Sequence, residues 1–233
     1  MNLLDALVGR YAHAVPLIAE HALLRCELGE FDGCNEVQKH LTELSAKAAA
    51  FDYEQTLTRL GRALKEMGDR CWEKIGRPFA ELGRLPPVQF CKIALKAYEA
   101  AYRMRQHYYP GANVAALALL TGDTARAREV AAALLEICGP MNVPAEEFYW
   151  NLATEGDAAL ILGMGEQARS YYQAAVSVLH SGETQHAISS YRQLLRLAGP
   201  LGADAVRPIL ALFEEHPVLG PKVKELATRR APC

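Results

Sequence analysis

Apolar residues recur at three- and four-residue spacing in almost every long segment of this chain, and no segment alternates apolar and polar residues over the length of a strand. That spacing places apolar side chains on one face of a helix, so the sequence predicts an all-α fold. The expected helices cover residues 3–14, 17–28, 32–49, 53–75, 88–106, 112–121, 124–138, 145–162, 165–179, 183–198, 203–215 and 219–229.

Glycines mark a repeated pattern within these helices. The chain can be aligned on Gly29, Gly68, Gly122 and Gly163. Small residues stand seven positions before all four glycines, and five positions after three of them: Ala22, Gly61, Ala115 and Gly156 before, and Cys34, Ala127 and Ala168 after. A small residue at the helix contact, a glycine at the turn and a second small residue on the facing helix form the tetratricopeptide pattern.

This pattern predicts a right-handed α-solenoid of tetratricopeptide-like helix pairs. The glycines are 39, 54 and 41 residues apart, against about 34 in ordinary tetratricopeptide repeats, so enlarged loops are expected. We expect one domain over residues 1–233, in which 183–233 supply the terminal capping helices that a solenoid needs. An irregular helical bundle, in which the glycines merely end helices, is the alternative.

Composition excludes several function classes. The 233 residues carry 25 basic and 27 acidic side chains without a long basic run, so nucleic acid and anionic membranes are not expected partners. The longest apolar stretch, Val114 to Leu120, is far shorter than the roughly 20 residues of a membrane helix, and the amino terminus carries Asp5 where a leader would be basic. Together with six scattered cysteines that form no CxxC, this predicts a cytoplasmic protein with reduced structural thiols.

Features that suggest catalysis have simpler explanations. Residues 163–168 fit GxGxxA, but a helix precedes them where a dinucleotide site needs a strand. The seven histidines form no HExxH and pair with no cysteine at metal-binding spacing. His180 and His186 flank a serine without an identifiable orienting group. We therefore expect no catalytic residues, no metal and no cofactor, and predict that the chain is not an enzyme.

Two stretches are more specific than the general tetratricopeptide pattern. The first contains Glu54, Thr56, Leu57, Leu60, Gly61, Arg62 and Lys65, followed by Trp72. The second reads His-Tyr-Tyr-Pro-Gly-Ala-Asn-Val-Ala over residues 107–115 and continues to Gly122-Asp123. Their order resembles the TRAF-binding, tetratricopeptide-like region of the apoptosis-signal-regulating MAP kinase kinase kinases and its bacterial relatives, over roughly residues 30–180. Ala112 replaces the isoleucine that is usual in the Tyr-Tyr-Pro-Gly-Ile-Asn motif.

The resemblance implies a regulatory scaffold. In animals this region lies beside a kinase, whereas bacterial relatives often accompany effector modules of conflict systems. No glycine-rich kinase loop, HRD or DFG sequence is present, so the resemblance carries no kinase activity to this chain.

The same motif has a direct physical interpretation. Pro110 disfavours helical geometry at Tyr109, and Gly111 permits an abrupt turn, so Tyr108 and Tyr109 are expected at a rigid corner before a helix over 112–121. Asn113 would then lie in the first turn, where its amide caps the backbone or reaches across a groove. Alternatively, both tyrosines simply pack the seam between repeats.

First helices of stacked pairs line the concave side of a solenoid, where partners usually bind. Mapping repeat positions onto that side gives the candidate binding residues Arg59, Arg62, Lys65, Tyr108, Tyr109, Asn113, Trp150 and Asp157. They would form a basic, aromatic-walled groove for an acidic peptide or an anionic small molecule. A solvated helix face with weak ion pairs is the alternative for the basic residues.

Two functions are compatible with this interpretation. The first is a non-catalytic scaffold or regulatory subunit that binds a protein partner, either an effector or a second copy of the chain. The alternative is a sensor that holds a nucleotide-like anion in the groove. A hydrolase is a third class, for which no constellation of residues argues.

Overall fold

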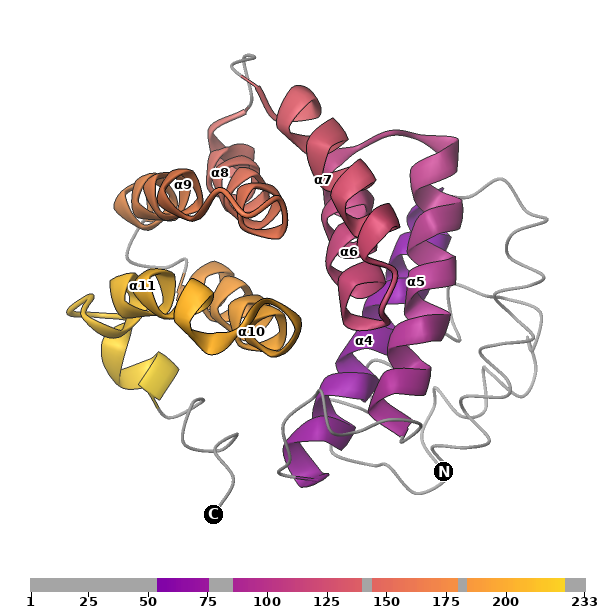
Figure 1. The fold of residues 1–233 in the computed structure, drawn as a ribbon, viewed down its shortest axis with the longest axis horizontal. Helices are drawn as coiled ribbons and strands as arrows, with labels where there is room; N and C mark the ends of the chain where they lie inside the picture. Colours follow the sequence, from indigo (N-terminus) through magenta and orange to yellow (C-terminus); the bar gives the residue numbers. More distant parts are fainter. Residues whose placement is uncertain (1–53, 76–85, 140–143, 180–183, 225–233) are drawn as a thin grey trace, which may run out of the picture. The chain divides into compact units, whose positions relative to one another are not determined.

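A computed structural model describes residues 54–75, 86–139, 144–179 and 184–224, and these residues contain helices and turns but no strand. The predicted all-α fold class is thereby confirmed. The helices expected before residue 53, with the turn at Gly29, lie outside the described residues. Contacts divide the chain into two compact units: an N-terminal unit with α4 and α5, and a C-terminal unit with α6 to α11 (Figure 1).

The N-terminal unit is a pair of long helices, α4 (Glu54–Ile75) and α5 (Pro86–Met104). They meet where Gly61 lies against the ring of Tyr98, so closely that a Cβ atom on Gly61 would be 2.8 Å from the ring. Gly61 is thus the small contact residue that the repeat pattern predicts. The predicted turn at Gly68 is wrong, because Gly68 lies inside α4.

The reason that α4 continues through Gly68 is its apolar face. A glycine inside a helix costs about 1 kcal/mol, whereas the buried residues of α4, including Leu57, Leu60 and Leu64, each gain more by packing. The connection between α4 and α5 therefore falls after Ile75, and the two helices of this pair are longer than those of the other pairs.

The C-terminal unit consists of three helical hairpins. Their helices are α6 (Tyr108–Leu120) with α7 (Thr124–Ile137), α8 (Ala145–Ile161) with α9 (Gly165–Ser177), and α10 (Thr184–Leu201) with α11 (Ala203–Glu214). A glycine with positive φ stands in each turn: Gly122 at +94°, Gly163 at +85° and Gly202 at +89°. Only glycine adopts this conformation without strain, so these glycines determine where each hairpin reverses.

Two of these turns share one hydrogen-bond pattern. After α6, the amide of Gly122 donates to the carbonyl of Leu119 and the amide of Asp123 to that of Ala118. The residues around Gly163 repeat both bonds. This is the Schellman motif, which satisfies the last carbonyls of a helix. Asp123 then caps α7 by accepting from the Arg126 amide at 3.0 Å.

The third turn differs from its prediction. The helix expected over residues 183–198 extends through Gly199 and Pro200, because α10 continues to Leu201 and the reversal occurs at Gly202. Because α11 starts immediately after its glycine, Val206 takes the buried position that Ala127 and Ala168 occupy in α7 and α9.

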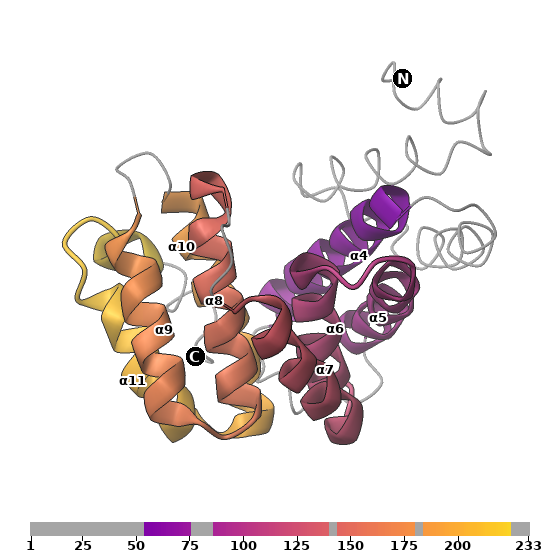
Figure 2. The same ribbon diagram turned by 90° about the horizontal axis from the view of Figure 1, so that it is seen from above.

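Consecutive hairpins pack on one another within the C-terminal unit. In Figures 1 and 2, α8 lies beside α10 and α9 beside α11, in agreement with the contacts between these elements. Phe213 of α11 meets the rings of Tyr172 and Tyr191 edge-on, at centroid distances of 5.8 and 6.0 Å. The predicted terminal pair therefore covers the apolar face of the pair before it.

One contact departs from a simple stack. In a solenoid each repeat touches only its neighbours, but α10 contacts α6 as well as α8. The first helices of all three hairpins thus converge. Across the described part of the chain, no helix is long and apolar enough to cross a membrane.

Candidate functional site

The eight predicted site residues are divided between the two units. Arg59, Arg62 and Lys65 lie on α4 of the N-terminal unit, and the other five lie on α6 and α8 of the C-terminal unit. On α4, the two arginines are exposed and Lys65 is half-buried.

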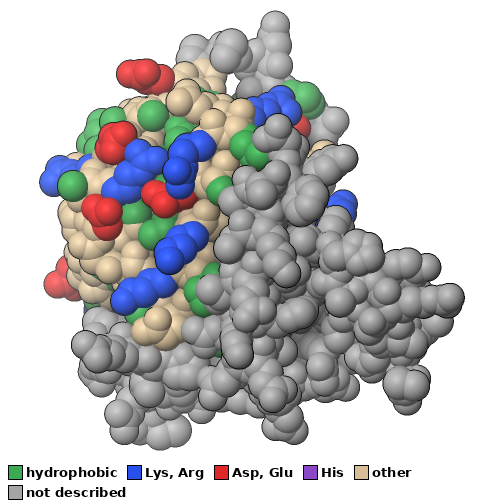
Figure 3. Space-filling model, turned by 90° about the vertical axis from the view of Figure 1, so that its right-hand side faces the viewer, with side chains coloured by type: hydrophobic (Ala, Val, Ile, Leu, Met, Phe, Trp, Pro, Cys, Tyr) green, Lys and Arg blue, Asp and Glu red, His purple; other side chains and the backbone are tan. Residues whose placement is uncertain are grey.

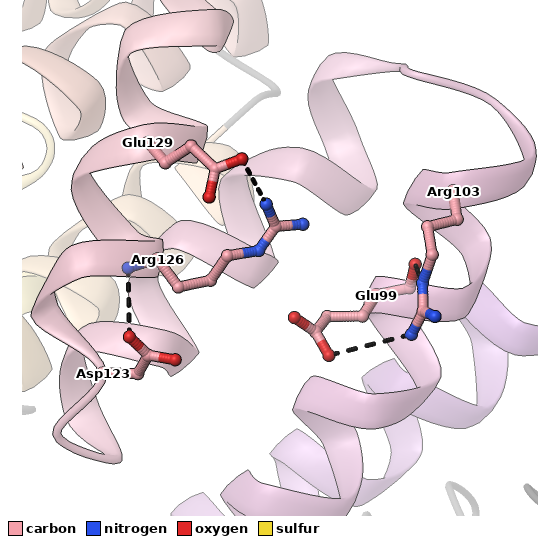
Figure 4. A network of polar contacts seen from close by, with 5 residues as sticks. All are labelled: Glu99, Arg103, Asp123, Arg126 and Glu129. Carbon is pink, nitrogen blue, oxygen red and sulfur yellow. Dashed lines mark hydrogen bonds and ion pairs between the residues drawn. The ribbon is translucent and has the colours of Figure 1, made fainter.

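Charged side chains on other helices form short-range surface pairs. Figure 3 shows lysine and arginine side chains interspersed with acidic ones on the face it draws. Arg126 of α7 pairs with Glu129 at 2.8 Å, and Arg103 of α5 pairs with Glu99 at 4.0 Å (Figure 4). Exposed pairs of this kind contribute about 0–1 kcal/mol and mark a solvated surface.

The Tyr-Tyr-Pro-Gly corner lies one turn earlier than predicted. α6 begins at Tyr108 rather than at residue 112, and the extended residue before it is His107, with φ −114° and ψ 148°. Pro110 is accommodated because the first turn of a helix needs no amide donors. The chain therefore changes direction at His107, and the motif itself is the first turn of α6.

Tyr108 joins two first helices. Its hydroxyl donates a hydrogen bond to the carboxylate of Glu147 on α8, and burial followed by the charge of Glu147 raises the pKa of the phenol well above its usual range. The side chain is half-buried, and its ring packs on that of His107 at a centroid distance of 4.4 Å. For Tyr108 this geometry favours packing between repeats over ligand binding.

Tyr109 and Asn113 have different environments. Asn113 is only 6% exposed, and its side-chain amide donates to the Tyr109 carbonyl at 2.9 Å. It therefore holds the first turn of α6 to the second. The Tyr109 side chain is 36% exposed. It is one of the few large apolar side chains that are exposed among the described residues.

Trp150 lies in an aromatic cluster between α8 and α10. Its ring meets Tyr149 edge-on at 5.3 Å and lies 4.8 Å from the ring of His186. The Tyr149 hydroxyl donates to Ser190 Oγ at 2.9 Å, which ties the two helices together. His186, considered from the sequence as a base, is thus a packing residue, and its buried Nδ1 has no hydrogen-bond partner in the described chain.

Asp157 holds α8 to α9. It is 9% exposed and accepts a hydrogen bond from the hydroxyl of the buried Tyr172 at 2.6 Å. The same tyrosine packs on Gly156, where a Cβ atom would be 2.6 Å from the ring. Burial and the charge of Asp157 raise the pKa of Tyr172 well above its usual range. This carboxylate therefore links the two helices of its hairpin.

Polar residues that sequence reasoning missed are buried on the first helices of the C-terminal unit. They are Asn151, Thr154 and Glu155 of α8 together with Ser190, Gln193 and Arg196 of α10, whereas the second helices have no buried polar side chain among their described residues. The Arg196 guanidinium donates to Gln193 Oε1 at 2.8 Å, and the Asn151 amide donates to the Cys138 carbonyl at 2.7 Å. The available signal was the interruption of the apolar face of α8 at residues 151, 154 and 155.

No family model matches the chain, and no curated protein matches it either. Among the described residues there is also no group of three or more His, Cys, Asp or Glu side chains placed to hold a metal ion.

Proposed function

We propose that this chain is a non-catalytic helical-repeat scaffold or regulatory subunit, and that a protein partner binds it at Tyr109. The observation that carries the proposal is the exposure of this aromatic ring on a well-supported turn. Three contacts support this turn. Pro110 and Gly111, which follow Tyr109, are buried, and the neighbouring Tyr108 is bonded to Glu147. The side-chain amide of Asn113 donates to the carbonyl of Tyr109.

A tyrosine presented in this way has the properties of a binding hot spot. Its ring supplies a large contact area, and its two side-chain torsions lose little entropy when a partner covers it. The supporting turn is already ordered, so association does not require the backbone to fold.

The same proposal includes a tetratricopeptide-like solenoid as the architecture and a signalling or bacterial conflict system as the biological setting. Three consecutive hairpins, each with a positive-φ glycine in its turn, support a tetratricopeptide-like solenoid. The resemblance of residues 107–113 to the TRAF-binding region of the MAP kinase kinase kinases supports a partner in signalling or in a bacterial conflict system. That partner is an effector or a second copy of the chain, in the cytoplasm.

A second function is supported by the exposed side chains of Arg59 and Arg62 on α4. Planar guanidinium groups recognise phosphate, so this helix would bind a nucleotide-like anion. A nucleotide present at ten times its dissociation constant should stabilise the protein by about 1.4 kcal/mol, and Arg62→Ala should abolish that stabilisation. If ATP, ADP and cyclic nucleotides leave the melting temperature unchanged, the sensor function is wrong.

The partner proposal is tested by affinity capture followed by calorimetry with the purified partner. Tyr109→Ala should weaken binding by roughly 30-fold, the effect of losing a hot spot worth about 2 kcal/mol. Phe148→Ala is the matched control, because it removes another exposed aromatic ring, on α8, which is 44% exposed. Equal affinity of the native chain and the Tyr109 variant would rule out this surface as the binding site.

A further inference from the structure

His107 holds the first turn of α6 through two acceptors. Its imidazole Nδ1 accepts a hydrogen bond from the amide of Tyr109 at 3.4 Å, and its carbonyl accepts from the amide of Gly111 at 3.2 Å. Pro110, which lies between them in the sequence, has no amide hydrogen to donate. Both of these amides in the first turn therefore donate to His107.

The imidazole occupies the N-cap position of α6. The backbone of His107 is extended, as is typical of this position, and its ring packs on that of Tyr108 at a centroid distance of 4.4 Å. Serine, threonine, asparagine and aspartate are the usual N-cap residues. Histidine differs from them because its side chain changes charge between pH 5 and pH 8.

Only the neutral imidazole can accept the hydrogen bond from Tyr109. In that form Nδ1 is an acceptor and the ring carries its hydrogen on Nε2. When Nδ1 gains a proton it becomes a donor that faces a donor amide, so the bond is lost. The imidazolium also places a positive charge at the start of a helix, where the dipole is already positive. Protonation therefore disfavours the closed turn through two effects.

The other titratable groups around this turn are a phenol, a thiol and a carboxylate. Burial followed by the charge of Glu147 raises the pKa of Tyr108 well above its usual range, and burial followed by the charge of Glu155 raises the pKa of Cys138, at the end of α7, to about 12. Neither of these two groups therefore changes charge between pH 5 and pH 8. The carboxylate of Glu147 on α8 favours an imidazolium, whereas Arg105, two residues before His107 in the sequence, disfavours it.

We propose that His107 is a pH-sensitive switch for the surface at Tyr109. The neutral ring closes the first turn of α6 and fixes the backbone that presents Tyr109, and the protonated ring releases that backbone. The proposal rests on the partner-binding function proposed above and adds its regulation. The affinity of the captured partner should fall by up to about fivefold from pH 7.5 to pH 5.5, the factor that corresponds to a typical N-cap.

The experiment uses the full chain without a partner and follows nuclear magnetic resonance signals between pH 5 and pH 8. At pH 8 the ring nitrogen shifts of His107 should show the hydrogen on Nε2 and none on Nδ1. As the pH falls, the amide signal of Tyr109 should move with the same midpoint as the His107 ring. His107→Asn should abolish this movement, because asparagine is a strong N-cap that does not titrate.

His216→Asn is the matched control for His107→Asn. The Nδ1 atom of His216 accepts from the amides of Val218 and Leu219 at 3.3 Å each, so this histidine makes the same kind of contact at another place in the chain. The control variant should leave the titration of the Tyr109 amide unchanged and should remove the titration of the Leu219 amide.

Two outcomes would overturn the proposal. If the ring of His107 carries its hydrogen on Nδ1 at pH 8, it cannot accept from the Tyr109 amide. If the Tyr109 amide signal does not follow the titration of the His107 ring, or titrates equally in His107→Asn, the imidazole does not control the turn. Both signals are measured without a partner, so they test the switch separately from the binding of a partner at Tyr109.

Discussion

At the scale of single residues, the same contact joins two of the hairpins. Gly61 lies against Tyr98 between α4 and α5, and Gly156 lies against Tyr172 between α8 and α9. In both, the absence of a Cβ atom lets an aromatic ring approach the backbone of the first helix. The resulting contact is too close for any other residue, so the glycine is required for packing although it weakens the helix.

Gly156→Ala should destabilise the protein. Its methyl group would stand 2.6 Å from the ring of Tyr172, which is fully buried and bonded to Asp157 and so cannot move aside. We expect a loss of about 1–3 kcal/mol in the free energy of unfolding, measured by urea denaturation followed by circular dichroism.

Gly199→Ala is the control for this prediction. Gly199 lies in α10, and a methyl group on it would meet no atom within 4 Å, so alanine there should be neutral or stabilising by up to about 1 kcal/mol. Equal effects of the two substitutions would show that helix propensity, and not the tyrosine contact, governs position 156.

At the scale of elements, the sequence predicts helices well where glycine and the apolar period agree. The turns at Gly122 and Gly163 are of this kind, and the hairpins α6/α7 and α8/α9 follow from them. Predictions failed where one local signal was given too much weight. Gly68 is overridden by the packing of α4, and Gly199-Pro200 by the continuation of α10.

The start of α6 shows why the candidate site was harder to predict than the fold. Pro110 predicts a helix boundary, but a proline is also accepted inside the first turn. Of the two roles predicted for Asn113, capping the backbone or reaching across a groove, the structure shows a backbone contact, in which its amide donates to the Tyr109 carbonyl. Side-chain partners between hairpins, such as Tyr108 with Glu147, leave no periodic signal in a sequence.

Tyr108→Phe should weaken the junction between α6 and α8. The substitution removes the hydroxyl that donates to Glu147 but keeps the ring against His107. A hydrogen bond to a charged acceptor contributes about 1.5–3 kcal/mol, so a loss near the lower bound is expected at this half-buried position. Urea denaturation measures the change.

Tyr171→Phe is the matched control for Tyr108→Phe. The Tyr171 hydroxyl accepts from the exposed Gln167 amide at 3.1 Å within α9, so its loss should change stability by less than about 0.5 kcal/mol. An equally small effect of Tyr108→Phe would mean that the bond to Glu147 contributes nothing to the junction.

At the scale of the whole molecule, the C-terminal unit is held together by aromatic and polar contacts between its hairpins. Phe213 touches one tyrosine from α9 and another from α10, and Tyr191 also donates to Glu214 at 2.7 Å. The contact of Phe213 with Tyr172 crosses from the third hairpin to the second, so these two hairpins should unfold together and not as separate modules.

Phe213→Ala tests that cooperativity. Removing a fully buried phenylalanine costs about 3–5 kcal/mol, and the cavity would face both Tyr172 and Tyr191. Amide hydrogen exchange should therefore show reduced protection in α9 as well as in α10 and α11. Phe148→Ala, at an exposed position, should leave protection unchanged. If only α10 and α11 lose protection, the third hairpin is an independent cap, and Phe213 does not couple it to the hairpin before it.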